Sequence, residues 1–342
     1  MVVQVKEVKM LMRFVFFAIA LLWTLFIPPT LSARQLTINV IGGSNGVGLD
    51  ADKLIMKREL EALGYIVNTL QLKAEEEPQK ADINIFFQNV GPKYFHHATL
   101  NWFVPNPECC RVEDEILNQF DLILCRTKEV ERIFLKKKMK TYFLGFTSVD
   151  CYLKNVKKNF SKFFHLGGRS KAKSTGIVFD LWKANGSLGF LTIVRDKPAP
   201  IGAASLHHLK WIGKHIPKHE LTILQNSAGI HLCPSEAEGY GHYLMEGMST
   251  GAVIITTNAP PMNEFITDER CLVPYTRQAP QALGTNYYIT QEDLEKVVLN
   301  LMQLSFSELA KIGRTNRQNY LTRTEQFRRR LEKLLNATNL PE

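Results

Sequence analysis

Residues 229–260 read GIHLCPSEAEGYGHYLMEGMSTGAVIITTNAP, and this stretch decides the fold. Apolar runs at 229–232 and 253–256 have the length of buried strands, and residues 242–250 between them have a helical pattern. The loop before the helix carries Gly239 and Gly241 on either side of Tyr240. The stretch therefore predicts a strand, a glycine-containing loop, a helix and a second strand, which is the repeating unit of an α/β sheet.

The same alternation extends to both sides of this stretch. In the first half it predicts strands at 36–41, 65–70, 83–87, 102–104, 122–125 and 142–144, with helices at 50–63 and 128–136. After a basic stretch at 152–162, it predicts strands at 163–166, 189–194, 229–232 and 253–256, helices at 174–184, 218–227 and 242–250, and two or three helices to the end. Two consecutive series predict two doubly wound α/β domains, 34–155 and 156–342, that face each other across a cleft.

Length and composition agree with this plan and exclude several classes. A chain of 342 residues has the length of two ordinary domains. With 45% hydrophobic and 22% charged residues, the chain is neither disordered nor a coiled coil. Six cysteines are too few for a small disulfide-stapled fold.

The first 33 residues are a segment of a different kind. Lys6, Lys9 and Arg13 precede an apolar run at 14–27 that ends at two prolines, and a small-residue cleavage site follows at Ala33. This order is typical of a secretory signal peptide, and an uncleaved membrane anchor or a misassigned start are the alternatives. Either membrane interpretation places the protein in the secretory pathway or the endomembrane lumen, secreted or anchored, whereas a misassigned start would leave it cytosolic.

The C-terminal region is strongly basic. Residues 311–333 contain eight Lys and Arg against Glu325 and Glu332, and the full chain has a formal net charge of +9. Such a patch can contact anionic lipid or nucleic acid. Because no nucleic-acid motif accompanies it, we predict a solvated helix face and no nucleic-acid partner. Membrane contact stays open, through this helix or through the N-terminal apolar segment.

The loop and helix of the opening stretch can bind a phosphate and hydroxyl groups. Glu238 lies in the loop and Glu246 about one turn inside the helix, which begins near Gly241. The free N–H groups and the positive dipole at a helix N-terminus attract an anion, and two carboxylates can accept hydrogen bonds from sugar hydroxyls. The alternative is that both glutamates are ordinary surface charges.

Three segments resemble retaining glycosyltransferases of family 4, which have the GT-B fold of two facing Rossmann-like domains. The first is the pair Glu238 and Glu246 with seven residues between them, in the context EGYG and MSTG. The second, FHLGGRSKAKST at 164–175, resembles the strand and turn that open the family's nucleotide-binding domain. The third, TNAPPMNE at 257–264, corresponds to a loop that ends in glutamate beside the donor site. The resemblance is strong over 163–275 and weaker before it.

The resemblance implies a role for each of these residues. Glu246 would accept the ribose hydroxyls of the nucleotide, and Glu238 would contact the donor sugar. Arg169 and Lys173 would neutralise the departing diphosphate, with Lys171 as a competitor of Lys173. The remaining substrate contacts would come from Gly239, from the backbone near Tyr240 and Gly241, and from Glu264.

Further expectations concern the chemistry and the family pattern. Two cations and a helix end can stabilise the leaving group, so the resemblance implies no metal and no cofactor, only a nucleotide-diphosphate sugar as donor substrate. It also implies retention of the anomeric configuration through front-face attack. Gly247 and Ser174 depart from the residues usual in the family, alanine and glycine.

A glycine-rich turn in the first half invites a dinucleotide interpretation. The turn GGSNGVGLD at 42–50 has its glycines in the order G-x-x-G-x-G, and the second strand lacks the acidic residue that would bind ribose. A nicotinamide-dependent oxidoreductase is therefore disfavoured. We predict instead that Gly46 and Gly48 lie close to the ligand, with a plain tight turn as the alternative.

The sequence thus predicts an enzyme, a hexosyltransferase acting on an unidentified glycan, lipid or protein acceptor. The alternative is a non-catalytic relative that binds a nucleotide sugar or glycan as a partner subunit or secreted effector. Cys125 and Cys233 are expected to be buried thiols, and the other four cysteines could form at most two bridges. Asn159, Asn185 and Asn336 match the glycosylation acceptor pattern of a secreted glycoprotein.

Overall fold

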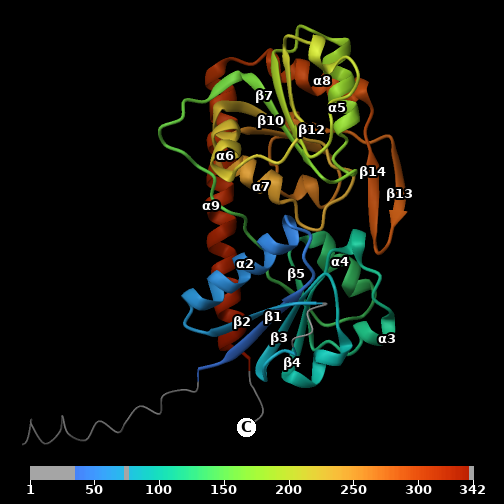
Figure 1. Cartoon of the computed structure of the whole chain (residues 1–342), viewed down its shortest axis with the longest axis vertical. Coiled ribbons are helices and arrows are strands. Elements are labelled where there is room, and N and C mark those ends of the chain that lie inside the picture. The colour runs from blue at the N-terminus through green and yellow to red at the C-terminus, as the bar shows by residue number, and fades with distance from the viewer. Residues whose placement is uncertain (1–34, 73–76, 339–342) are drawn as a thin grey trace, which may run out of the picture. The chain divides into compact units, whose positions relative to one another are not determined.

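The computed structural model describes residues 35–72 and 77–338. The predicted N-terminal signal or anchor at 1–33 lies outside these residues. Within the described part, no helix is long and apolar enough to cross a bilayer. Residues 37–342 make up one compact unit that contains two six-stranded sheets (Figure 1).

The first sheet is parallel throughout, in the order β2-β1-β3-β4-β5-β6. Its central strands are buried along nearly their whole length, as expected for a parallel sheet covered on both faces. Its strands are β1 (Thr37–Gly42), β2 (Ile66–Gln71), β3 (Ala81–Phe87), β4 (Ala98–Val104), β5 (Leu122–Cys125) and β6 (Thr141–Phe143). Its helices are α2 (Gly48–Ala62), α3 (Asp114–Leu117) and α4 (Lys128–Lys136), with 3-10 turns η1 (Pro92–His97) and η2 (Pro107–Cys109). We call this part the first lobe.

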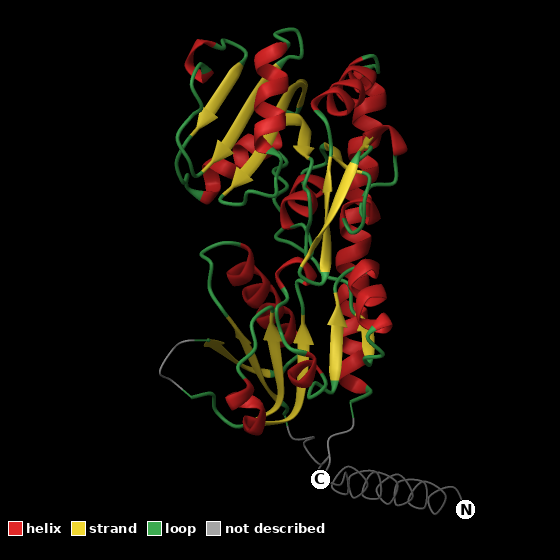
Figure 2. Ribbon diagram, turned by 90° about the vertical axis from the view of Figure 1, so that its right-hand side faces the viewer, coloured by secondary structure: helices red, strands yellow, loops and turns green. Residues whose placement is uncertain are grey.

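The second sheet is also parallel, in the order β12-β11-β10-β7-β8-β9 (Figure 2). Its strands are β7 (Asn159–Gly168), β8 (Phe190–Arg195), β9 (Leu209–Ile212), β10 (Ala228–Cys233), β11 (Val253–Thr257) and β12 (Leu272–Val273). Its helices are α5 (Thr175–Ala184), α6 (Lys218–Ser227), α7 (His242–Ser249) and α8 (Gln291–Met302), with 3-10 turns η3 (Ala203–Ser205), η4 (Met262–Glu264) and η5 (Glu269–Cys271). An antiparallel hairpin, β13 (Arg277–Gln281) and β14 (Gly284–Tyr288), precedes α8. We call this part the second lobe.

The two predicted α/β series are therefore confirmed, and several bounds match residue for residue. Helices α4 and α6 cover the predicted residues, because Thr127 caps α4 through its side chain and Pro217 precedes α6. Strand β9 and the hairpin are absent from the prediction. The first hairpin strand is mostly exposed and the second mostly half-buried, and neither carries an apolar run.

The last helix, α9 (Phe306–Asn336), runs alongside both lobes (Figure 1). It begins with a capping box made by Ser305 and Glu308, and its 31 residues correspond to a length of about 46 Å. Near its end, Phe327 is fully buried and lies 5.0 Å, ring to ring, from Phe146. The Tyr142 hydroxyl donates to the Arg330 carbonyl at 2.9 Å, so the helix leaves the second lobe and packs on the first.

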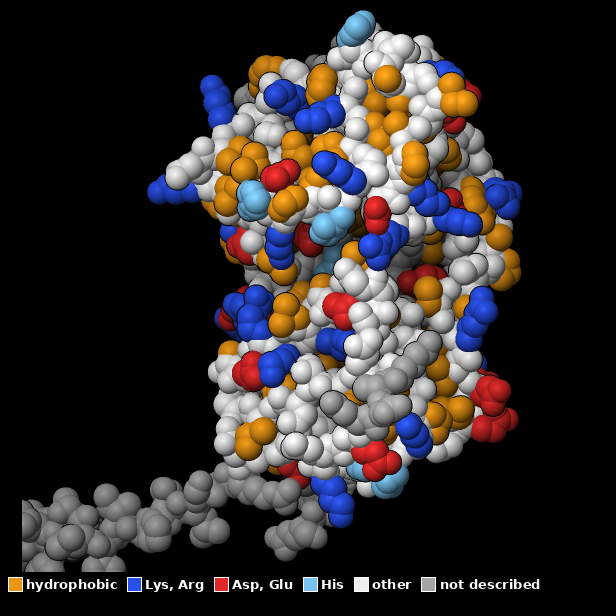
Figure 3. All heavy atoms as spheres, in the orientation of Figure 1, with side chains coloured by type: hydrophobic (Ala, Val, Ile, Leu, Met, Phe, Trp, Pro, Cys, Tyr) orange, Lys and Arg blue, Asp and Glu red, His pale blue; other side chains and the backbone are white. Residues whose placement is uncertain are grey.

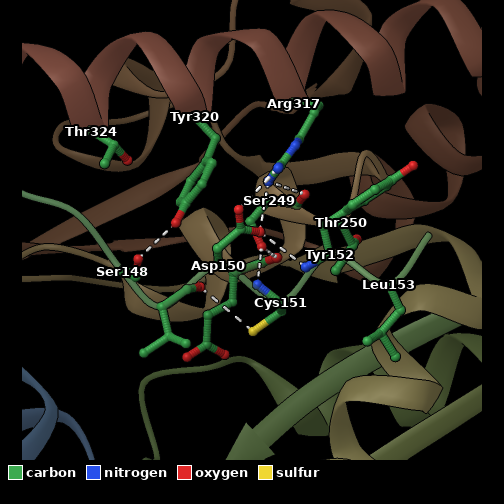
Figure 4. A network of polar contacts seen from close by, with 12 residues as sticks. Ser148, Asp150, Cys151, Tyr152, Leu153, Ser249, Thr250, Arg317, Tyr320 and Thr324 are labelled. Carbon is green, nitrogen blue, oxygen red and sulfur yellow. Dashed lines mark hydrogen bonds and ion pairs between the residues drawn. The ribbon is translucent and has the colours of Figure 1, made fainter.

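Helix α9 and α7 also fix the segment that joins the two sheets (Figure 4). Arg317 holds the Asp150 carboxylate through two hydrogen bonds of 2.7 and 2.9 Å. The Cys151 amide donates to Ser249 Oγ at 2.9 Å, and the Tyr320 hydroxyl donates to the Ser148 carbonyl at 2.8 Å. The joining segment is thus hydrogen-bonded to α7 and α9.

The basic face of this helix is largely exposed, as predicted, and some of its residues also pair with acidic or backbone groups. Arg317 pairs with Asp150, and Arg328 donates to the Glu59 carboxylate of α2 at 2.7 Å. Arg323 is half-buried and donates to the Glu264 carbonyl. Five of the eight basic residues are exposed: Lys311, Arg314, Arg328, Arg329 and Lys333. The sequence did not indicate the ion pairs, because the acidic partners lie far away along the chain.

Candidate active site

The loop at 234–241 and the start of α7 form the centre of the candidate site. Gly241 is the N-cap of α7 and has a φ of +97°, a conformation that favours glycine. No side chain caps the helix. Its first N–H groups and its positive dipole end therefore remain available to an anion.

Lys173 and Glu238 meet beside this helix end. Lys173 follows β7, and its ammonium forms an ion pair with the Glu238 carboxylate. The Ser235 hydroxyl donates to the same carboxylate oxygen, and Lys173 Nζ lies 3.5 Å from the centre of the Tyr243 ring. The side chains of Lys173 and Glu238 are only 16% and 12% exposed, so their charges act in a poorly solvated place.

Glu246 lies on α7, where Gln225 Nε2 donates to its Oε2 at 3.1 Å. Its charge, like those of Lys173 and Glu238, acts on the buried thiol of Cys233. Burial is the larger cause of that thiol's raised pKa. Three of the predicted site residues thus surround the end of one strand, β10, as expected for strand ends in parallel sheets.

Arg169 lies at the edge of this group. Its guanidinium is 62% exposed and pairs with Asp196 at 2.8 Å. A Cβ placed on Gly46 would lie 3.5 Å from Arg169 Nη1, so the glycine-rich turn of the first lobe is next to Arg169. Gly46 has a φ of +72°, and nothing lies within 4 Å of a Cβ placed on Gly48.

The glycine-rich turn is internally bonded. Asp50 Oδ2 accepts hydrogen bonds from Gly46 N at 2.8 Å, from Asn45 N at 3.2 Å and from Ser44 Oγ at 2.9 Å. Burial alone would raise the pKa of Asp50, but the bonds from Ser44 and Gly46 and the charge of Lys53 lower it. Ionised Asp50 therefore occupies amides that a phosphate would otherwise use.

Tyr240 and Gly239 contact the first lobe. The Tyr240 side chain is buried, and its hydroxyl donates to the Phe146 carbonyl at 2.7 Å. A side chain at Gly239 would collide with Asn106. The absence of a side chain at Gly239 therefore lets this loop lie against Asn106 of the first lobe.

Glu264 also has a partner in the first lobe. Its two carboxylate oxygens accept hydrogen bonds from the amides of Lys128 at 2.7 Å and Glu129 at 2.8 Å, the first residues of α4. A carboxylate at a helix N-terminus is favoured by the helix dipole. The carboxylate of Glu264, which we expected to contact the donor, therefore forms hydrogen bonds between the two lobes.

A buried charged cluster that the sequence did not indicate lies between the lobes. Asp52 Oδ1 accepts from Arg126 Nη1 at 2.7 Å and from His242 Nε2 at 2.8 Å. Ser148 Oγ lies 2.7 Å from His242 Nδ1, and Arg126 Nη2 donates to Asn106. His242 is the first residue of α7, so the cluster fixes the helix end of the site to α2 and to the end of β5.

The cysteines do not form the bridges that the sequence left open. All six are free thiols in the structure, and Cys125 and Cys233 are buried as predicted. Over residues 35–72 and 77–338, His, Cys, Asp and Glu side chains do not gather in threes as at a metal site. Charged side chains of both signs, with histidine, gather at mid-height of the face in Figure 3, where the lobes meet.

Known proteins share both a sequence segment and the fold. Residues 201–298 match the family described as glycosyl transferases group 1. No curated protein matches the chain in sequence. HepE of Anabaena in complex with UDP is similar in structure, with a TM-score of 0.61 and 12% identity over 89% of this chain and 100% of that one.

Two further solved structures are similar in the same way. Sucrose-phosphate synthase from Thermosynechococcus elongatus has a TM-score of 0.63 and 13% identity, over 89% of this chain and 100% of that one. The pneumococcal O-GlcNAc transferase GtfA, in complex with UDP and GlcNAc, has a TM-score of 0.57 and 13% identity, over 84% of this chain and 60% of that one. At such identities the likeness establishes the fold alone. The chain has the GT-B fold of two Rossmann-like domains, and its residues 201–298 match the glycosyl transferases of group 1.

Proposed function

We propose that the protein is a retaining glycosyltransferase that moves a hexose from a nucleoside diphosphate sugar to a hydroxyl of a glycan, lipid or protein. The observation that carries the proposal is the pairing of Lys173 with Glu238 beside the uncapped start of α7. The family match over residues 201–298 supports it, and so do the UDP complexes of structures with the same fold, which favour a UDP-sugar.

In this proposal Lys173 exchanges partners when the donor binds. The diphosphate draws the ammonium away from Glu238, which leaves that carboxylate to accept a hydrogen bond from the donor sugar. Glu246 accepts the ribose hydroxyls, and Arg169 turns from exposed Asp196 to the phosphates. The backbone amides at 240–242 face the negative charge of the diphosphate.

The reaction breaks the bond between the anomeric carbon and the phosphate oxygen, and the diphosphate leaves with the electron pair. The acceptor oxygen forms its bond on the same face of the sugar and passes its proton to the departing phosphate. Fixed positive charge in a poorly solvated site stabilises the growing charge of the leaving group better than water does. Because Lys173, Arg169 and the helix end supply that charge, the proposal requires no metal and no cofactor.

The test is release of nucleoside diphosphate from a panel of UDP-, GDP- and ADP-hexoses, with water or added glycans as acceptor. We expect Lys173→Ala to lower turnover about 100-fold or more, as for the loss of one charge-stabilising donor. Lys171→Ala is the matched control, because Lys171 is an exposed lysine two residues away, and it should keep wild-type turnover. Turnover should also persist in EDTA.

The outcomes separate this proposal from its alternative. If the protein binds a nucleotide sugar but releases no nucleoside diphosphate with any acceptor tested, it is a non-catalytic relative. Equal loss in Lys171→Ala and Lys173→Ala would contradict the placement of the site. The anomeric configuration of the product, read by NMR, tests retention.

For the location of the protein, we propose the endomembrane lumen, because a nucleotide-sugar donor is available there and residues 1–33 have the pattern of a signal or anchor. N-terminal sequencing of the protein purified from its host tests this. A first residue at position 34 would indicate cleavage, whereas an intact start in a membrane fraction would indicate an anchor.

A further inference from the structure

Glu108 has a carboxylate oxygen that is buried and has no partner. It lies in η2, directly after β4 of the first lobe. Its Oε2 is inaccessible to solvent and makes no hydrogen bond to any described residue. Buried polar atoms in proteins are nearly always paired, and leaving one unpaired costs stability. An unpaired buried oxygen is therefore a place where a ligand can supply the missing hydrogen bond.

The segment that carries Glu108 lies against the candidate site. Asn106, two residues before it, is in contact with Gly239 of the loop that holds Glu238. On the other side the hairpin packs on η2, where Leu283 N donates to the Pro107 carbonyl at 3.0 Å. A Cβ on Gly284 would lie 3.1 Å from Glu108 N. The backbone of Glu108 is thus fixed between the hairpin and the site loop.

The charged groups that face Glu108 belong to that site. Glu238 lies in the loop after β10, Lys173 after β7 and Arg126 after β5, and all three act on the Glu108 carboxyl. Cys109 is adjacent, but its thiol has a pKa raised to about 11, first by burial and then by Glu108, so it stays neutral near pH 7.

These surroundings alter the protonation of Glu108. Burial, and to a smaller extent the charge of Glu238, raise its pKa, while its own backbone N–H, Arg126 and Lys173 lower it, and the net result is a pKa raised to about 7. Near neutral pH, both the neutral carboxyl and the carboxylate are therefore populated. The neutral carboxyl can donate a hydrogen bond to a sugar hydroxyl, and the carboxylate can accept one.

We propose that Glu108 binds a hydroxyl of the donor sugar, opposite the Lys173–Glu238 pair. This assignment rests on the proposed function. It places one sugar contact on the first lobe, so that the hexose is held from both sides.

The test compares the affinities of UDP and the matching UDP-hexose by calorimetry at several pH values. The ratio of the two affinities isolates the sugar. We expect Glu108→Ala to weaken UDP-hexose binding about 10-fold while UDP binding is unchanged, a loss typical of one buried hydrogen bond. Glu108→Gln keeps a neutral donor and should retain the affinity. Glu115→Gln, an exposed carboxyl in α3, is the matched control.

The pH dependence distinguishes binding from a structural role. The affinity ratio of the wild type, divided by that of Glu108→Gln, should change between pH 6 and pH 8, because the neutral and ionised carboxyl bind a hydroxyl with different strength. The terminal phosphate of UDP titrates in the same range, but it does so for both proteins and cancels in this comparison. A purely structural carboxyl would change the melting temperature and leave the affinity ratio unmoved.

Two results would overturn the assignment of Glu108, and only one of them would also overturn the proposed function. If the wild type binds UDP-hexoses but Glu108→Ala weakens UDP and UDP-hexose equally or not at all, only the assignment fails. If the folded wild type binds no nucleotide sugar, the proposed function fails with it.

Discussion

At the scale of single residues, Asp52 is one of the residues through which the two lobes contact each other. Its buried carboxylate accepts from Arg126 within the first lobe and from His242 of the second. Burial works to raise the pKa of Asp52, but the charges of Arg126 and His242 hold it below its usual value. The ionised form is therefore the one that the folded protein requires.

We predict that Asp52→Asn destabilises the protein by about 3–5 kcal/mol at pH 7, because it leaves the Arg126 guanidinium buried without its counter-charge. Urea unfolding measures the change. Because the folded-state pKa of Asp52 is depressed, its contribution is present above about pH 4 and is lost as the pH falls through the folded value. Wild type and variant should therefore converge in acid.

Asp180→Asn is the control, because Asp180 is an exposed carboxylate on α5. Its free energy of unfolding should stay within about 0.5 kcal/mol of the wild type. A similarly small change in Asp52→Asn would mean that the Asp52 cluster does not hold the lobes.

At the scale of elements, α9 joins lobes that the chain otherwise links by a single segment. Its first half packs beside α7 and β11, and its second half places Phe327 and Leu331 in the core near Phe146. Figure 2 shows this helix lying along both sheets. A helix of this length is favoured by burial of its apolar face on two surfaces at once.

We predict that Phe327→Ala lowers the free energy of unfolding by about 3–5 kcal/mol, the usual cost of removing a fully buried aromatic ring. Arg329→Ala, two residues away on the exposed face, should change it by less than about 0.5 kcal/mol. Thermal unfolding of the two variants provides the comparison. Equal stabilities would show that the end of α9 is not docked on the first lobe.

At the scale of the whole molecule, two buried histidines make the second lobe sensitive to acid. His165 on β7 bonds the Leu232 carbonyl and Thr175 Oγ1, each at 2.8 Å, and His231 on β10 bonds the Gln225 carbonyl at 2.8 Å. Burial lowers the pKa of His165 to about 4 and that of His231 to about 3. Both rings are therefore neutral in the folded protein near pH 6.

We predict that stability falls as the pH drops from 6.5 to 4. The unfolded chain protonates these histidines near pH 6.5, so over this interval it binds more protons than the folded chain, and stability rises with pH. His165 alone accounts for about 3 kcal/mol over the interval. Urea unfolding of His165→Gln should show a shallower dependence on pH, whereas exposed His207→Gln should retain the wild-type slope.

The sequence indicates the fold because apolar runs and their spacing are local properties. The run at 122–125 and the helix at 128–136 appear in the structure with the same bounds. The hairpin does not, because its strands are half-buried or exposed and are held by pairing and by contact with η2. The hairpin is stabilised by tertiary contacts, and no local sequence pattern predicts it.

The candidate site divides in the same way. The glycines, Glu238 and Lys173 stand in short motifs, so that their type and spacing were enough to select them. Glu108 and Asp52 stand in no motif, and each interacts with charged groups more than 60 residues away in the chain. Glu264 was selected as a ligand contact, but the structure pairs it with a helix end about 135 residues away.

By itself, then, the sequence determined two α/β series, the loop that joins β10 to α7, and which residues of that loop are candidates for binding a phosphate and a sugar. Only the tertiary structure decided which charges face one another: Asp52 with His242, Glu264 with α4, and Glu108 with the Lys173–Glu238 pair. The physical reason is that hydrophobic periodicity is a property of residues that are neighbours in the sequence, whereas burial and charge pairing arise only when distant segments pack together.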